Sequence, residues 1–98
     1  MKYSSKPTDE YLLRLVEVEI RIEKRLIDYL AEHSKVKIEY VRVKIFEIEN
    51  RSCCYVVDIH IKRYYDDEGF FHRFRSPDPY YLEISDFAYM LKTIASRV

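Results

Sequence analysis

The segment VVDIHIKRYY, residues 56–65, alternates between apolar and polar side chains. On an extended strand the two kinds of side chain fall on opposite faces, with Val57, Ile59 and Ile61 on one face and Asp58, His60 and Lys62 on the other. Strict alternation is typical of a strand whose sheet has one face on the core and one face in solvent. The segment therefore predicts a half-buried sheet, and it raises the question of what the polar face does.

Two segments rich in β-branched and aromatic residues, 36–49 and 53–65, flank the sequence ENRS and predict a β-hairpin. With residues 50–52 as the loop, Val43 lies opposite Ile59 and the apolar faces of both strands coincide. A slip of one residue would turn cationic side chains of the first strand toward the core, at a high energetic cost. The same register places two opposite-charge pairs face to face, Glu39 with Arg63 and Lys44 with Asp58.

A long helix is predicted over about residues 8–33. The stretch 15–24 alternates like a strand, but its flanks have helical spacing and nothing between Thr8 and His33 breaks a helix. Thr8 is a candidate N-cap, and Asp9 follows at the positive end of the helix dipole. The alternative, a strand over residues 15–24, would change the assignment of the sheet faces.

The rest of the chain predicts a third strand and a closing helix. Gly69 supplies a positive φ for a second turn, and the strand at residues 70–75 then turns Phe70 and Phe74 to the core and Phe71, Arg73 and Arg75 outward, with His72 between the core residues. A matching register for this hairpin brings Lys62 near Arg73.

The prolines at 77 and 79 end the strand, and residues 80–84 are expected to form a short fourth edge strand. Ser85 is the expected N-cap of the last helix, whose apolar face carries Phe87, Met90, Leu91, Ile94 and Val98. The predicted fold is a single compact α+β domain over residues 1–98. Its element order is α-β-β-β-α, a three-stranded antiparallel meander with two helices on one face.

Composition narrows the function classes. The 98 residues include 17 basic and 17 acidic side chains, so the net charge is zero and electrostatic recognition requires that charges be segregated. No apolar run is long enough to cross a bilayer, and the N-terminus lacks the apolar core of a signal peptide, which predicts a cytoplasmic protein with no membrane contact. The absence of Gln and the abundance of both charges are typical of hyperthermophile proteins, so we expect an archaeon, or a virus or mobile element in its host cytoplasm.

The predicted first helix has an unusually wide apolar surface, which covers more than half of its circumference and exceeds what one sheet can bury. This predicts a homodimer, with the interface at Tyr11, Leu15, Val18, Ile22 and Tyr29. Glu19 and Glu23 lie one turn apart on the same helix. They could share a metal ion or a proton, but we favour pairing with Arg or Tyr across an interface.

The polar face of the predicted sheet concentrates cationic and aromatic side chains. Cations suit phosphates and aromatic rings suit base stacking, so the leading prediction is DNA or RNA binding on this face. The predicted nucleic-acid-binding residues are Tyr40, Arg42, Lys44, His60, Lys62, Tyr64, Phe71, Arg73 and Arg75.

Two other functions remain open. The wide apolar helix and ten Tyr residues suit a dimeric protein-binding module, such as an inhibitor or adaptor. The element order also resembles the front of restriction-endonuclease-like metal nucleases, which implies a helix carboxylate near an Asp and an acid-x-Lys pair on neighbouring strands. Asp58 and Lys62 are the candidates, but the third strand of this chain has no acid-x-Lys pair. The order of double-stranded RNA-binding domains is similar too, but Ser85, Asp86 and Phe87 replace the basic start of their second helix.

No catalytic residue, metal ligand set or cofactor is predicted. One glycine cannot form a phosphate-binding loop, and no Ser lies in a tight Gly-rich turn. Cys53 and Cys54 are adjacent, and neighbours on a strand point to opposite faces, so we expect neither a metal site nor a disulfide within the chain. The sequence therefore predicts a small binding module without enzymatic activity.

Overall fold

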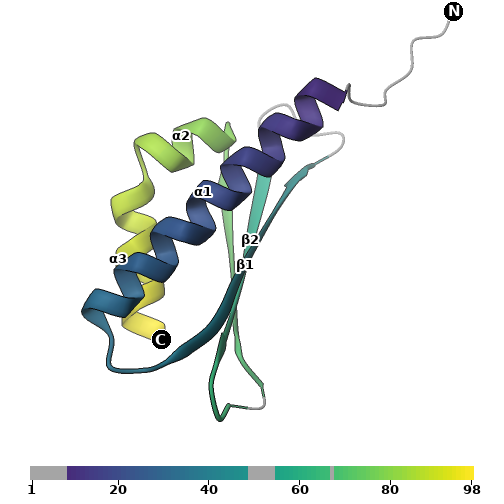
Figure 1. Ribbon diagram of the computed structural model, residues 1–98. Helices are drawn as coiled ribbons and strands as arrows, with labels where there is room; N and C mark the ends of the chain where they lie inside the picture. The colour runs from purple at the N-terminus through teal and green to yellow at the C-terminus, as the bar shows by residue number, and fades with distance from the viewer. Residues whose placement is uncertain (1–8, 49–54, 67) are drawn as a thin grey trace, which may run out of the picture.

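The computed structural model describes residues 9–48, 55–66 and 68–98, and it has an α+β fold with one three-stranded antiparallel sheet of strand order β1-β2-β3 (Figure 1). The elements in chain order are α1 (Asp9–His33), β1 (Ile38–Glu47), β2 (Tyr55–Arg63), β3 (Phe70–Ser76), α2 (Pro79–Ile84) and α3 (Phe87–Arg97). Thr8, the loop at residues 50–52, Cys53 and Cys54 lie outside the described residues.

Helix α1 is continuous over the alternating stretch, so the prediction of a helix is confirmed and the strand alternative is wrong. The buried side chains of α1 recur every fourth residue, at Val18, Ile22, Leu26 and Leu30. This spacing places them on one face of the helix, and α1 turns that face to the core.

The register of β1 and β2 agrees with the prediction over most of its length. Val43 lies opposite Ile59, and Lys44 lies opposite Asp58. The register shifts between Ile38 and Tyr40, so Ile38 rather than Glu39 lies opposite Arg63, and the predicted pairing of Glu39 with Arg63 is wrong. The Glu39 carboxylate lies instead 3.5 Å from the Lys62 ammonium group. Glu39 is thus an extra residue in β1. The rest of β1 keeps its alternation of apolar and polar residues, so the sequence pattern did not reveal the extra residue.

The turn between β2 and β3 depends on Gly69, whose φ of +74° confirms the predicted left-handed conformation. A Cβ atom at this position would lie 3.1 Å from the carbonyl oxygen of Ile61. In the resulting register Asp58 lies opposite Arg73. The predicted proximity of Lys62 and Arg73 is therefore wrong. The last residue pair before the turn is Ile61 with Phe70, so the unpaired segment between β2 and β3 is longer than the prediction assumed.

Residues 79–84 form helix α2, and the prediction of a fourth strand at 80–84 is wrong. Asp78 is the N-cap, and its carboxylate accepts a hydrogen bond of 2.6 Å from the backbone N–H of Tyr80. Pro79 occupies the first turn, where its fixed φ and missing N–H carry no cost. Ser85 is the C-cap of α2, and Asp86 rather than Ser85 is the N-cap of α3.

A single hydrophobic core contains side chains from all three helices and from one face of each strand. Figure 1 shows α1 running beside β1, with α2 and α3 next to it on the same side of the sheet. The closing helix contributes Phe87, Met90 and Ile94 as buried residues, and Leu91 and Val98 pack against them, as predicted. The strand side chains that point away from this core form the opposite face of the sheet.

Candidate nucleic-acid interface

The open face of the sheet consists of the strand side chains that alternate with the core residues. Most of these side chains are exposed, whereas Val56 and Asp58 are buried among their neighbours. We use the name open face for Tyr40, Arg42, Lys44, Phe46, Val56, Asp58, His60, Lys62, Phe71, Arg73 and Arg75.

The registers of the two hairpins order the open face into rows that run across the strands. From one end of the sheet to the other, the rows are Tyr40–Lys62, Arg42–His60–Phe71, Lys44–Asp58–Arg73 and Phe46–Val56–Arg75. Adjacent strands are about 4.8 Å apart, so each three-residue row is about 10 Å wide. Each of these three rows carries at least one cationic side chain, and two of them carry a phenylalanine.

Asp58 neutralises one of these cations. Its carboxylate accepts two hydrogen bonds from the Arg73 guanidinium, from Nε at 2.6 Å and from Nη2 at 2.8 Å. Asp58 is only 7% exposed, and the hydrogen bond to it raises the pKa of Arg73. Two hydrogen bonds to a buried carboxylate thus hold Arg73, and it is less available to a ligand than its sequence position suggests.

Three other cations of the open face have no such partner. Among residues 9–48, 55–66 and 68–98, no carboxylate oxygen lies within 4.0 Å of the charged groups of Arg42, Lys44 or Arg75. The guanidinium of Arg42 lies 4.3 Å from the centre of the Tyr40 ring, an arrangement that keeps its N–H groups available at the edge. These three residues belong to three successive rows.

Two aromatic rings are exposed next to these cations. Phe46 is 52% exposed at the end of β1, and Phe71 is 47% exposed on β3. His60 lies on the central strand β2, and its ring is tilted against that of Phe71, with 4.7 Å between ring centres. Tyr64 does not belong to this group: it follows β2 and lines a hollow beside the C-terminal end of α1.

Glu19 and Glu23, the paired carboxylates of α1, bind the sheet edge. Glu23 accepts a hydrogen bond of 2.8 Å from the backbone N–H of Val43, and Glu19 accepts one of 2.8 Å from the N–H of Ile45. Alternate N–H groups of an edge strand point away from the sheet and need partners. The two carboxylates therefore provide hydrogen-bond acceptors for two outward-pointing N–H groups of β1. The sequence analysis expected side chains of Arg or Tyr as their partners.

The residues of the nuclease alternative are not brought together. Asp58 and Lys62 lie on the open face, whereas Glu19 and Glu23 are bound to the edge of β1. In the described part of the chain, no group of three or more His, Cys, Asp or Glu side chains could hold a metal ion. A search of the same residues for a helix long and apolar enough to cross a membrane found none.

The residues predicted for a dimer interface line the inner side of α1. Val18 and Ile22 are fully buried, Leu15 packs against the core, Tyr29 is partly buried, and the Tyr11 hydroxyl lies 2.7 Å from that of Tyr55. Other apolar residues of α1 are exposed instead: Leu12, Leu13, Val16, Ile20 and Ile27. The helix does have more apolar surface than the core uses, but the excess is on a different face.

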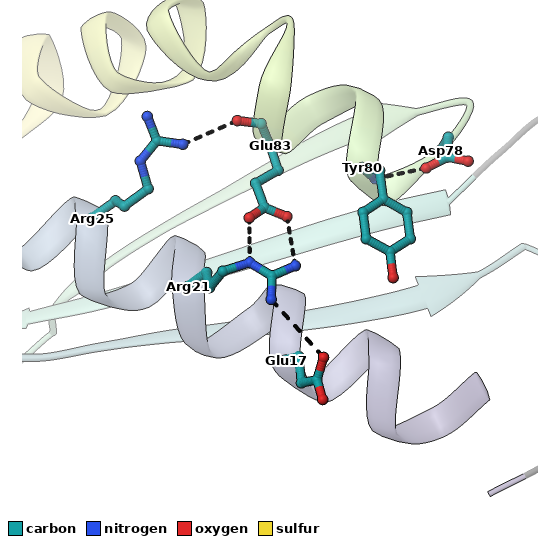
Figure 2. Close-up of polar contacts among 6 residues, drawn as sticks. All are labelled: Glu17, Arg21, Arg25, Asp78, Tyr80 and Glu83. Atoms are coloured by element: carbon teal, nitrogen blue, oxygen red, sulfur yellow. Dashed lines mark hydrogen bonds and ion pairs between the residues drawn. The ribbon is translucent and has the colours of Figure 1, made fainter. Parts of the chain in front are cut away.

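A polar cluster that joins α1 to α2 was not foreseen (Figure 2). Glu83 is buried, and its carboxylate binds the Arg21 guanidinium at 2.5 Å and 3.1 Å. Arg25 donates to the Glu83 carbonyl oxygen at 3.1 Å and lies over the Phe87 ring at 3.6 Å. All the groups of this cluster are used in helix packing, so we assign it a structural role.

Comparisons with protein-family models, with curated proteins and with solved structures found no match for this chain.

Proposed function

We propose that the protein is a binding module that takes up a single-stranded segment of DNA or RNA on the open face. The observation that supports the proposal is the interleaving of Arg42, Lys44 and Arg75, which have no acid partner among the described residues, with two exposed phenylalanine rings. Cationic side chains bind phosphate oxygens, and exposed rings stack on bases whatever their sequence.

The rings lie at opposite corners of the basic area, since Phe46 is two rows from Phe71 and on the other outer strand. Two rows correspond to four residues along a strand, or about 13 Å, and the two strand spacings add about 10 Å across. A single strand with unstacked bases can reach both rings, whereas the bases of a duplex are already stacked on each other. The layout therefore favours single strands over duplexes.

The test is fluorescence anisotropy with labelled 12-nucleotide homopolymers of DNA and RNA over a range of salt concentrations. Three phosphate contacts predict a slope of log K against log salt of about −2, because each contact on a single strand contributes about −0.7. Arg42→Gln should weaken binding and reduce the magnitude of this slope by about 0.7. Phe71→Ala should weaken binding by about 1–3 kcal/mol and leave the slope unchanged, since stacking releases no counterions.

Lys92→Gln is the matched control. Lys92 is an exposed cation on α3, and α3 packs on the core side of the sheet and not on the open face. It should bind as the wild type does. Equal losses for Arg42→Gln and Lys92→Gln would mean that binding follows overall charge and not this surface, and an absence of binding at low salt would refute the proposal.

A second candidate function is protein association through α1. It is favoured by the exposed apolar side chains of that helix, which lie away from the open face at the outer edge of β1. Such a surface is typical of an interface.

A further inference from the structure

The exposed apolar side chains of α1 are regularly spaced. Leu13, Ile20 and Ile27 are seven residues apart, and Val16 lies between the first two. Seven residues are close to two helical turns, so these side chains form one stripe about 21 Å long. Leu13 protrudes most, at 62% exposed. We call these four residues the α1 stripe.

A hollow of about 370 Å³ lies at one end of the stripe. It is between the C-terminal turns of α1 and the start of β1, and its lining includes Ile27 and Ala31 of the helix and Val36 and Ile38 of the following chain. The protruding Leu13 and this hollow are thus at opposite ends of the same helix face, on either side of Ile20.

The stripe is complementary to itself under a two-fold rotation. Leu13 and Ile27 are each seven residues from Ile20, so two antiparallel copies of α1 that cross at Ile20 place Leu13 of each copy against Ile27 of the other. A leucine side chain would then enter each hollow. An interface with two-fold symmetry requires this reciprocity, in which a protruding group and its pocket occur on the same protomer.

The charges beside the stripe match the same arrangement. Glu17 precedes Ile20 by three residues and Lys24 follows it by four, so an antiparallel pair places Glu17 of one copy near Lys24 of the other. The acidic first turn of α1, with Asp9 and Glu10, likewise meets the end of the partner helix. The rim of the hollow there carries Lys35 and Lys37. A parallel pair would set each of these charged groups against its own copy.

We infer that two copies of this chain associate through the α1 stripe, with the helices antiparallel, Ile20 on the two-fold axis and Leu13 of each copy in the hollow of the other. The partner is a second copy because the stripe, the hollow and the flanking charges all complement one another on this single protomer. The inference is independent of nucleic-acid binding, since it uses none of the open face.

The first test is the mass of the full chain in solution, by sedimentation equilibrium or light scattering without nucleic acid. We expect twice the chain mass of 12.0 kDa. Leu13→Asp and Ile20→Asp should each raise the dimer dissociation constant at least about tenfold, because each buries a carboxylate in an apolar contact, while the helix signal in circular dichroism stays the same. Ile84→Asp is the matched control, since Ile84 is 78% exposed on α2 and should leave the dimer intact.

A second test addresses the orientation of the helices. Glu17→Lys should weaken the dimer by opposing the partner's lysine at position 24, and the further change Lys24→Glu should restore it. In a Cys53→Ser, Cys54→Ser background, Ile20→Cys should oxidise to a disulfide-linked dimer across the axis, whereas Glu32→Cys should not.

A monomer at about 100 μM would overturn the inference and leave the stripe to a different molecule. A dimer unaffected by Leu13→Asp and Ile20→Asp would overturn it equally, because its interface would then lie elsewhere. Weakening by Glu17→Lys without rescue by Lys24→Glu would rule out the antiparallel arrangement.

Discussion

Asp58 limits the positive charge of the open face. Its carboxylate is buried and binds Arg73 of β3 through two hydrogen bonds. Lys44 of β1 lies opposite Asp58 on the other side. Asp58→Asn should lower the free energy of unfolding by about 1–3 kcal/mol, the usual cost of losing a hydrogen bond to a charged group in a buried site. If nucleic acid binds here, the same change should strengthen binding and steepen the salt dependence by about 0.7, because Arg73 becomes available to a phosphate.

Urea titration and anisotropy measure the two effects on the same preparations. Asp28→Asn is the control, since it makes the same change in net charge at an exposed position on α1. Equal changes in binding for both variants would contradict a specific role of Asp58.

The residue-scale pairings show what a sequence can and cannot predict. The alternation in β2 and β3 places Asp58 and Arg73 on the open face correctly, because side-chain direction follows from the strand period alone. Which cation meets Asp58 depends on the length of the turn before β3. The partners of Glu19 and Glu23 are the backbone N–H groups of Ile45 and Val43, which are 26 and 20 residues away. No spacing in the sequence encodes such contacts.

At the scale of elements, the buried carboxylate of Glu83 helps to hold α2 against α1. Glu83→Ala should lower the free energy of unfolding by about 1–3 kcal/mol, because it removes both hydrogen bonds that the buried carboxylate accepts from Arg21. Glu39→Ala is a suitable control, since Glu39 also pairs with a cation, Lys62, but the Glu39 side chain is more exposed than that of Glu83 and should contribute less than about 1 kcal/mol. Similar losses in urea denaturation for the two variants would show that the Arg21–Glu83 pair does not anchor the helix.

The elements themselves were predictable where their pattern is long. Helix α1 has 25 residues and β1 has 10, so many positions agree on one period. Helix α2 has only six, and its tyrosines and isoleucine favour a strand by propensity. Its cap decided the outcome, because Asp78 and Pro79 together fix the first helical turn.

At the scale of the whole molecule, folding stability should depend on pH through His72. Burial and then the positive charge of Arg97 lower the pKa of His72, whose Nδ1 lies 3.1 Å from the Arg97 guanidinium and whose ring packs between Phe70 and Phe74. The folded protein therefore holds this histidine neutral at a pH where the unfolded chain, with a pKa near 6.5, binds a proton. Stability from this group is complete above about pH 6.5 and is lost as the pH falls through the lower pKa of the folded state.

Urea denaturation between pH 7.5 and pH 5 measures this dependence. His72→Phe should make the curve flatter over that range, because the ring contacts are kept and the titrating group is removed. Arg97→Gln should flatten it only in part, since burial continues to oppose protonation when the neighbouring charge is gone. An unchanged slope in His72→Phe would show that the loss of stability in mild acid arises elsewhere, and that the contact between α3 and β3 is not sensitive to protonation.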